Sequence, residues 1–430
     1  MKIPKEKKDF LINKSSIFCL SPFMGNKHYF NYFSPCLSEY RDHHFVEEND
    51  LRIHDANEII NKEKYNKLRL AMIHNDVSSK ELDRCKMCNM FNAAGARCSR
   101  EWSNYYYEDI FDDIMDNINE DGSLKDPNLI FYVHLSYTNT CNYKCRYCEP
   151  ERSSALTNEF KALKKDMNYV VDRNKKEFFK NELFDKWKQK LLTTRLIHFT
   201  CSGEALLTQE NIDVMKFLID NNKTDVHLLY NTNLSVRYFN NTDIFNLWSK
   251  FKKVIVLVSA EGLDPYHQII KGSPNKFSTV EENIKTLRAM PNITLNVHAT
   301  YGAHNFLHLP KFHKYLYDKK LIKANEFYLN PLFQDPESVQ IYPLYMKKKA
   351  EAVYLNHINW LNSIKDEEHI VNFYFNKSSG EYKNAINFMY LNDKTHLISS
   401  YIKSYEEIDN FRKTDSFVLE ELKMLRSASR

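Results

Sequence analysis

The sequence predicts an α/β fold, namely a partial (β/α)6 TIM-like barrel with an N-terminal Cys-rich region and a C-terminal helical cap. From Asn128 onward, short apolar runs alternate with longer amphipathic segments, a pattern typical of a parallel sheet whose strands are joined by helices. The 430 residues give room for two or three domains. We expect a Cys-rich region at 1–125, the barrel at 126–335 and a mainly helical region at 336–430.

Six apolar runs are the expected strands of the barrel. They lie at 129–135, 195–200, 226–230, 254–258, 293–299 and 326–329. Six βα units make a partial barrel rather than the closed eight. Between the first two strands, apolar residues recur every four positions, which indicates a helix with one apolar face. These residues are Phe179, Leu183, Trp187 and Leu191. Parallel architectures of this kind place their chemistry at the carboxyl ends of the strands.

The first 125 residues contain four cysteines that can form one site. Cys19 and Cys36 lie next to prolines and are therefore expected in turns. A helix is expected over 58–74, and Cys85-x-x-Cys88 follows it. The chain has nine cysteines, an odd number, and most of them are grouped, which favours metal ligation in a reducing compartment over disulfides. Four thiolates suit a closed iron–sulfur cluster or a zinc ion equally well.

Composition argues against several classes of partner. The 60 basic and 56 acidic residues leave a net charge of only +4, so no nucleic acid or other polyanion is indicated. The longest aliphatic run, 254–258, is too short to span a membrane, and no apolar segment follows the charged N-terminus. We expect a cytoplasmic protein.

The region 343–430 is helical in pattern and has no cysteine, so we interpret it as a packed cap over the open side of the barrel.

Three cysteines after the first strand form the motif around which the rest is interpreted. Cys141, Cys145 and Cys148 lie within eight residues, and their spacing differs from the paired C-x-x-C pattern of zinc sites. Three thiolates without an adjacent fourth ligand leave one metal position open, as a catalytic site requires. Chance clustering or a partial zinc site is the alternative. With Tyr147 before the last cysteine, the stretch resembles the signature of the radical S-adenosylmethionine (SAM) superfamily.

This resemblance implies that the three cysteines hold three irons of a [4Fe–4S] cluster and that SAM chelates the fourth. It extends to Ser202-Gly203-Glu204, which is similar to the family's G-G-E-P-L element with Ser for the first Gly and Ala205 for Pro. In relatives this Glu and the flanking backbone hold the amino group of SAM, a charge-assisted contact. A surface Glu after a turn is the alternative. Cys201 is expected to be a small buried filler.

Two further strand ends carry family-like residues. Asn233 follows Thr232 as in the family's T-N pair, and Ser259 and Glu261 lie where relatives commonly show S-x-D-G. The resemblance implies polar contacts from this strand end to the ribose and carboxylate of SAM. Relatives often have Arg near Lys271, and Lys lacks the bidentate fork of Arg. The implied cofactor-binding residues are therefore Tyr147, Ser202, Gly203, Glu204, Asn233, Ser259 and Glu261.

The N-terminal region resembles the auxiliary-cluster region of twitch domain-containing radical SAM proteins. The similar positions are Leu68-Arg69-Leu70-Ala71-Met72, Cys85, Cys88, Gly95, Ser99-Arg100 and Asn104. The resemblance implies a second, auxiliary iron–sulfur cluster, and we assign Cys19, Cys36, Cys85 and Cys88 as its ligands; structural zinc is the alternative. Cys98 is either an alternative ligand or a free thiol, and we favour the free thiol.

The function implied by the resemblance is reductive cleavage of SAM to a 5′-deoxyadenosyl radical. That radical removes hydrogen from a peptide or small-molecule substrate, and we lean to an oxidative modification. An external donor such as a flavodoxin or ferredoxin would supply the electron, and a second cluster could accept the electron left on the substrate. One rival is a non-catalytic zinc or other metal-binding protein. Another is a SAM-dependent methyl or group transfer without net oxidation.

Overall fold

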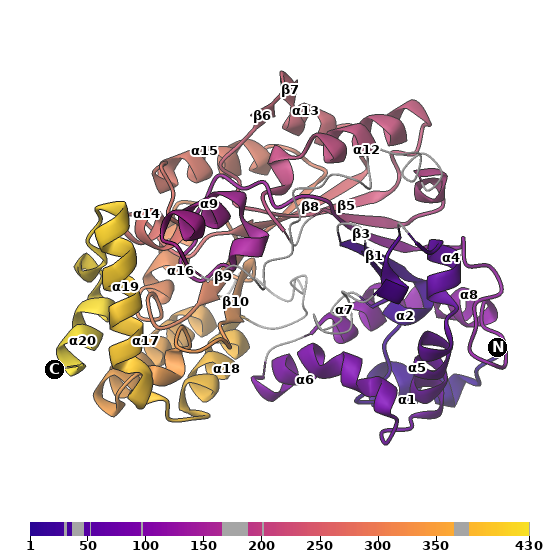
Figure 1. Cartoon of the computed structure of the whole chain (residues 1–430), viewed down its shortest axis with the longest axis horizontal. Helices are drawn as coiled ribbons and strands as arrows, with labels where there is room; N and C mark the ends of the chain where they lie inside the picture. Colours follow the sequence, from indigo (N-terminus) through magenta and orange to yellow (C-terminus); the bar gives the residue numbers. More distant parts are fainter. Residues whose placement is uncertain are drawn as a thin grey trace.

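The chain is described by a computed structural model over residues 1–29, 32–36, 47–51, 53–95, 98–165, 188–199, 202–364 and 378–429. An eight-stranded sheet with the order β10-β9-β8-β5-β4-β3-β1-β2 forms its centre (Figure 1). The strands are β1 (Gly25–Tyr29), β2 (Tyr32–Ser34), β3 (Tyr132–Ser136), β4 (Leu196–Phe199), β5 (His227–Thr232), β8 (Lys253–Ser259), β9 (Ile293–Tyr301) and β10 (Phe327–Pro331). A separate two-stranded ladder joins β6 (Tyr238–Phe239) to β7 (Thr242–Asp243).

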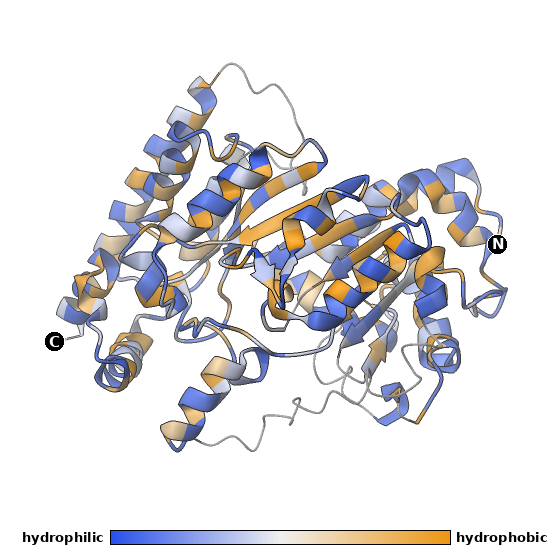
Figure 2. Cartoon of the chain, turned by 90° about the horizontal axis from the view of Figure 1, so that it is seen from above, coloured by the Kyte–Doolittle hydropathy of each residue, from blue (hydrophilic) through white to orange (hydrophobic). Residues whose placement is uncertain are grey.

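The six strands predicted for the barrel are all present and pair in parallel, from β3 at one end to β10 at the other. The sheet is open, which confirms a partial barrel. The strand at 129–135 begins three residues later than predicted, because Leu129 lies in a turn closed by its amide and the carbonyl of Asp126. The continuous apolar character of the central strands is visible in Figure 2 and follows from burial of both faces of the sheet.

Two strands from the N-terminal region were not predicted. Strand β1 pairs in parallel with β3, with Gly25 opposite Tyr132, and β2 pairs antiparallel with β1. The stretch Gly25-Asn26-Lys27-His28 has no apolar alternation, so it gives no strand signal in the sequence. The N-terminal region therefore extends the same sheet that carries the three-Cys motif.

Helices surround the sheet on its faces and at both ends (Figure 1). The N-terminal helices are α1 (Lys5–Asn13), α2 (Ser21–Met24), α4 (Ala56–Ile60), α5 (Glu63–His74), α6 (Lys86–Ala93), α7 (Ser99–Tyr106) and α8 (Phe111–Asp116). The helices that follow the barrel strands are α9 (Ser154–Ala162), α12 (Gln209–Asp220), α13 (Ile244–Trp248), α14 (Tyr266–Lys271), α15 (Phe277–Arg288) and α16 (Leu309–Asp318). The C-terminal helices are α17 (Leu344–Ser363), α18 (Ser378–Tyr390), α19 (Ile398–Arg412) and α20 (Glu420–Ala428).

Short 3-10 helices occupy several connections. They are η1 (Glu47–Asn49), η2 (Lys80–Cys85), η3 (Glu108–Ile110), η4 (Pro150–Arg152), η5 (Lys188–Leu192), η6 (Ala205–Leu207), η7 (Val339–Ile341), η8 (Thr395–Leu397) and η9 (Ser416–Val418). The single helix predicted over 58–74 is two helices, α4 and α5, because the backbone is extended at Lys62. Of the helix predicted from Phe179, Leu183, Trp187 and Leu191, only Leu191 lies within the described residues, where it is buried in η5.

The C-terminal helices form the predicted helical cap, which lies beyond β9 and β10 and ends at the opposite side of the molecule from the N-terminus (Figure 1). No helix within the described ranges is both long and apolar enough to cross a membrane. Glu421 attaches the last helix to the barrel. Its carboxylate accepts hydrogen bonds from the hydroxyl of Tyr266 at 2.7 Å and from the amide of His308 at 3.0 Å.

Glu421 makes the attachment of the cap sensitive to pH. Its side chain is fully buried, and this burial raises the pKa of its carboxyl to about 7. A folded-state pKa above the unfolded value means that the folded state holds the proton more tightly. The stabilisation of the folded state by the protonated Glu421 carboxyl is therefore complete below about pH 4.5. It is lost as the pH rises through about 7.

We predict that Glu421→Gln removes this dependence. Relative to the variant, the wild-type chain should lose about 2–3 kcal/mol of unfolding free energy between about pH 5 and pH 8. Urea denaturation of both proteins at the two pH values measures the difference. A difference that is the same at both values would contradict the assignment.

Candidate functional site

Strands β3, β4, β5 and β8 end at one edge of the sheet, and the three-Cys loop, 141–148, lies there. A turn between the amide of Cys148 and the carbonyl of Cys145, at 3.0 Å, closes the second half of the loop. The amide of Tyr143 lies 3.5 Å from Cys141 Sγ. Burial, reinforced by the neighbouring thiols, raises the pKa of Cys141 and Cys148 to about 12. The three thiols are half-buried and close enough to influence one another's pKa, and they would bind a metal with release of protons.

The first support of this loop is the turn at Gly203. The amide of Glu204 donates to the carbonyl of Thr140 at 2.7 Å, immediately before Cys141. Gly203 has φ +73°, and a Cβ at this position would lie 2.5 Å from the same carbonyl oxygen. Only glycine combines this backbone conformation with so close an approach. The Ser202-Gly203-Glu204 turn is therefore fixed directly against the start of the three-Cys loop.

The carboxylate of Glu204 lies inside this arrangement and is not on the surface. It accepts hydrogen bonds from the amide of Asn233 at 2.7 Å, the amide of Leu206 at 3.0 Å and the hydroxyl of Thr232. Burial raises its pKa, and the three hydrogen bonds oppose that rise. An ionised carboxylate has about four acceptor positions, so one position is left for a further donor. The alternative of an exposed Glu after a turn is wrong.

Asn233 links the end of β5 to the three-Cys loop. Its side-chain amide donates to Asn142 Oδ1 at 2.9 Å, and Asn142 in turn donates to the hydroxyl of Ser235 at 2.9 Å. Ser235 Oγ donates back to Asn233 Oδ1 at 2.7 Å. The closed network holds the residue that follows Cys141, a role for Asn142 that no sequence signal indicated.

The second support comes from the end of α14. The amides of Lys144 and Arg146 donate to the carbonyls of Lys271 and Ile270 at 3.0 and 2.8 Å. The next residue, Gly272, has φ +54°, and a Cβ there would lie 2.6 Å from the carbonyl of Lys144. The loop thus pairs, residue by residue, with a segment more than a hundred positions away.

Lys271 and Glu261 form a buried ion pair beside the thiols. Lys271 Nζ lies 2.9 Å from Glu261 Oε2 and donates to the hydroxyl of Tyr147 at 3.1 Å. Burial works against the charge on Lys271, but Cys145, Glu261 and Tyr147 raise its pKa well above the ordinary value. The predicted contacts Glu261 and Tyr147 are therefore joined through Lys271. Ser259 ends β8 close by and is half-buried.

The third support comes from the C-terminal cap, to which the sequence assigned no chemistry. Asp409, from α19, is ion-paired with Arg146, and the Arg146 guanidinium lies over the ring of Tyr405, 4.6 Å from its centroid. Arg412 donates to the carbonyl of Lys144 at 2.8 Å and pairs with Glu159 at 2.7 Å. The cap therefore holds the outer side of the three-Cys loop.

Buried polar atoms gather on the inner side of the same edge. His304 is fully buried and stacks on Tyr147, with ring centroids 5.8 Å apart. Its nearest acidic group is Glu337, with 3.6 Å between His304 Nδ1 and Glu337 Oε2. Neither ring nitrogen of His304, nor the hydroxyl of Ser202, nor Asn139 Oδ1 finds a hydrogen-bond partner among the residues that the structure describes. Buried polar atoms without partners suit a polar ligand at this place.

The N-terminal cysteines form a second thiol site. Cys19, Cys85, Cys88 and Cys98 are buried and Cys36 is half-buried. The thiol of Cys98, more than burial, raises the pKa of Cys88 well above its ordinary value, and Cys19 and Cys36 add to this rise. Cys98 therefore lies inside the group of thiols rather than apart from it.

Asn104, from α7, positions Cys19. Its side chain accepts a hydrogen bond from the amide of Leu20 at 2.9 Å and donates to the carbonyl of Phe18 at 3.0 Å. The two contacts hold the backbone on both sides of Cys19. Arg69 also has a structural role, because its guanidinium donates to backbone carbonyls and side-chain amide oxygens around it.

Cysteine thiolates are the usual ligands of iron–sulfur clusters, so both groups of thiols could hold one. Three thiolates with one open position suit the first site, and four thiolates suit a closed second site. Among the described residues, no three His, Cys, Asp or Glu side chains stand close enough to surround a single metal ion.

Comparisons with known proteins give only distant likenesses. No known protein family and no curated protein matches the sequence. The chain is similar to a solved structure described as native anSMEcpe with bound AdoMet, at 17% identity and a TM-score of 0.36, over 54% of this chain and 59% of that one. The form with AdoMet and the Kp18Cys peptide gives 17% and 0.35, with the same coverage.

A structure of TYW1 with a lysine-pyruvate adduct bound gives 14% identity and a TM-score of 0.29, over 56% of this chain and 74% of that one. The chain thus spans less than two thirds of the anSMEcpe chains. Likenesses this distant do not assign the chain to a family.

We predict that Gly203→Ala loosens the three-Cys loop. A Cβ would strain the backbone and displace the carbonyl of Thr140, lowering the free energy of unfolding by about 2–4 kcal/mol. Gly380→Ala is the matched control, because a Cβ there meets nothing within 4 Å. It lies inside α18 and should stabilise the chain by about 0.5–1 kcal/mol. Chemical denaturation measures both, and equal effects would contradict the close contact.

Asp409→Asn tests the support from the cap. It leaves the buried Arg146 guanidinium without a counter-charge, which should lower the free energy of unfolding by about 3 kcal/mol. Combining it with Arg146→Met removes both charges and should recover part of this loss. A double-mutant cycle measured by denaturation gives the coupling, and additive effects of the two substitutions would show that the pair is not coupled.

Proposed function

We propose that the chain is a radical SAM enzyme. The observation that carries this proposal is the position of three thiols in one short loop at the carboxyl ends of parallel strands. The turn after β4, the end of α14 and the cap hold this loop. Cys141, Cys145 and Cys148 would hold an iron–sulfur cluster with one iron open for SAM. When bound, such a cluster supplies the electron that cleaves SAM reductively to methionine and a 5′-deoxyadenosyl radical.

The residues around the loop would bind and orient SAM. Glu204 has an acceptor position left for an ammonium group, and Ser202 offers a buried hydroxyl beside it. Asn233 orders the loop from the opposite side through Asn142. Lys271 already neutralises Glu261, so a SAM carboxylate near it would compete with that carboxylate. We therefore assign Glu204 and Ser202 to SAM, with Gly203, Asn233, Ser259, Glu261 and Tyr147 shaping the site.

The substrate would enter the polar interior near His304 and Glu337. His304 is buried and stacks on the ring of Tyr147, Glu337 is half-buried, and both can exchange hydrogen bonds with a polar ligand. A peptide or a polar small molecule fits this lining. We propose an oxidative modification, with an external electron donor and with the N-terminal thiol group holding an auxiliary cluster. A zinc or other metal-binding protein and a SAM-dependent methyl or group transfer are the rivals.

The test is cleavage of SAM. Wild-type protein, purified and reconstituted without oxygen, should form 5′-deoxyadenosine and methionine from SAM when dithionite is supplied. The Cys141, Cys145, Cys148→Ala variant should form neither, because it lacks the ligands. Glu149→Gln, a change next to Cys148 at a partly exposed side chain paired with Arg152, is the control for general damage to the loop and should retain the activity.

Three other results would contradict the proposal or redirect it. Binding of zinc without any cleavage of SAM favours the metal-binding protein. Equal formation of deoxyadenosine by the triple variant would mean that the three thiols are not the ligands. Transfer of the labelled methyl group of SAM without deoxyadenosine would favour group transfer.

A further inference from the structure

The N-terminal thiol site contains a buried cation that the assigned function does not use. Arg100 lies in the first turn of α7, two residues after Cys98, and is only 3% exposed. One of its nitrogens, Nη2, donates to Asn89 Oδ1 at 3.0 Å, next to Cys88. Its Nε and Nη1 find no hydrogen-bond partner within the described part of the chain. A guanidinium with two unsatisfied donors in the interior is costly unless an anion accepts them.

The surroundings of Arg100 contain thiols and no acidic partner that the structure describes as paired with it. Burial disfavours its charge, yet four neighbouring thiols raise its pKa. These are the thiols of Cys98, Cys88, Cys19 and Cys85. The nearest carboxylate in sequence, Glu101, instead accepts the amide of Cys98 at 3.1 Å.

Arg69 is a second buried arginine, and no thiol contributes to its pKa. Its Nε donates to the carbonyl of Gly122 at 2.6 Å, its Nη1 to that of Pro22 at 2.9 Å and its Nη2 to that of Ile60 at 2.8 Å. Burial among these neutral acceptors lowers the pKa of Arg69 to about 9. Both arginines are buried, but Arg69 has all its donor nitrogens engaged by oxygen acceptors, whereas Arg100 has thiols around it and two nitrogens without a partner among the described residues.

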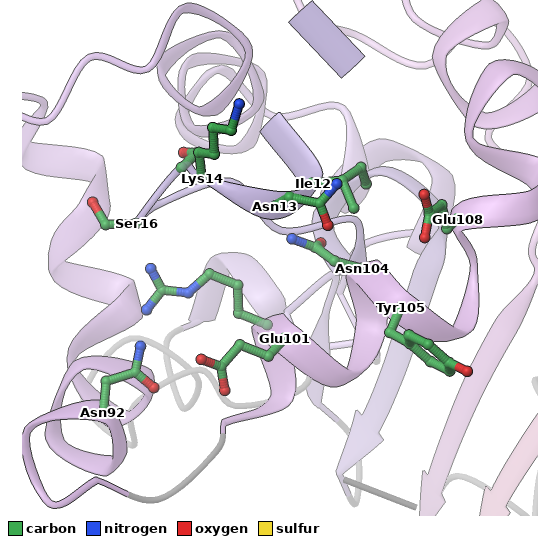
Figure 3. Close-up of a pocket in the computed structure, with 11 residues that line it drawn as sticks. Ile12, Asn13, Lys14, Ser16, Asn92, Glu101, Asn104, Tyr105 and Glu108 are labelled. Atoms are coloured by element: carbon green, nitrogen blue, oxygen red, sulfur yellow. The ribbon is translucent and has the colours of Figure 1, made fainter. Parts of the chain in front are cut away.

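Arg100 also lines a polar pocket of about 600 Å³. Figure 3 shows Asn104 and Glu101, from α7, on one side of this pocket, with Asn92, from α6, and Lys14 around it. Asn104 is engaged with the backbone around Cys19, as described above. Helix α7 thus carries both the cation and the residue that holds Cys19, and Cys98 immediately precedes it.

We infer that Arg100 is the built-in counter-charge of the N-terminal metal centre and donates Nε–H and Nη1–H to its thiolates, including that of Cys98. This inference rests on the proposed function, because it requires a cluster at these thiols. Hydrogen bonds to cluster sulfurs and nearby positive charge set the reduction potential of such a centre. A positive charge favours the reduced, more negative state, so Arg100 raises the potential and eases transfer of an electron onto this centre.

The experiment uses the full chain with Cys141, Cys145 and Cys148 replaced by Ala, so that only the N-terminal centre is present. Arg100→Gln, Arg100→Lys and Arg69→Lys are made in this background, reconstituted without oxygen and titrated with dithionite. Iron and sulfide content, absorbance and electron paramagnetic resonance follow the centre. Reduction in Arg100→Gln should be at least tenfold less favourable, a shift of about 59 mV to more negative potential for one electron.

The other two variants separate charge from packing. Arg100→Lys keeps the charge and should recover most of the shift, whereas Arg69→Lys should leave the potential unchanged even if it destabilises the chain. An unchanged potential in Arg100→Gln, an equal shift in Arg69→Lys, or loss of the centre in both Arg100 variants would overturn the inference. So would a zinc-only site, which has no redox couple. Cleavage of SAM by the wild type is scored separately, so a failure of this inference can be told apart from a failure of the proposed function.

Discussion

The structure of the site depends on three sets of contacts that hold the three-Cys loop in place. An eight-residue loop that carries three thiols has too little apolar surface to order itself. Its shape is set by Gly203 on one side, by Gly272 on the second and by Asp409 of the cap on the third. A side chain at Gly203 would collide with the backbone just before the loop, and one at Gly272 would collide with the carbonyl of Lys144 inside it. The geometry of the thiols is therefore a property of the whole barrel, as a preorganised metal site requires.

A buried cation lies near each group of thiols, and the two cations have different partners. Lys271 lies beside Cys145 but is shared with Glu261 and Tyr147. Arg100 lies among thiols and has an amide as its one described partner. Several thiolates placed in a low-dielectric interior need positive charge nearby. At the first site the positive charge of Lys271 is offset by the carboxylate of Glu261. At the second site Arg100 has only a neutral amide as a described partner. The two centres would therefore have different electrostatic environments.

The sequence predicted the parts of the fold that local pattern determines. Six strands were found because each is a compact apolar run, whereas β1 was missed because Asn26-Lys27-His28 is polar and becomes a strand only beside β3. The motif residues Cys141, Glu204 and Asn233 were predicted at strand ends and do meet there. Their roles as ligands stay predictions.

Residues whose role depends on tertiary contacts could not be recognised from the sequence. Asp409 and Arg412 are ordinary charges on an amphipathic helix, indistinguishable in the sequence from solvated ones, and their burial appears only when α19 packs on the loop. Cys98 was favoured as a free thiol, and its role stays a prediction.

The central claim is that the three-Cys loop holds an iron–sulfur cluster and that a second cluster lies at the N-terminal thiols. Iron, sulfide and zinc per chain, measured after anaerobic reconstitution of the wild type and of the variant lacking Cys141, Cys145 and Cys148, test it most directly. The account predicts about eight irons in the wild type and about four in the variant. Zinc in place of iron in the wild type would contradict it.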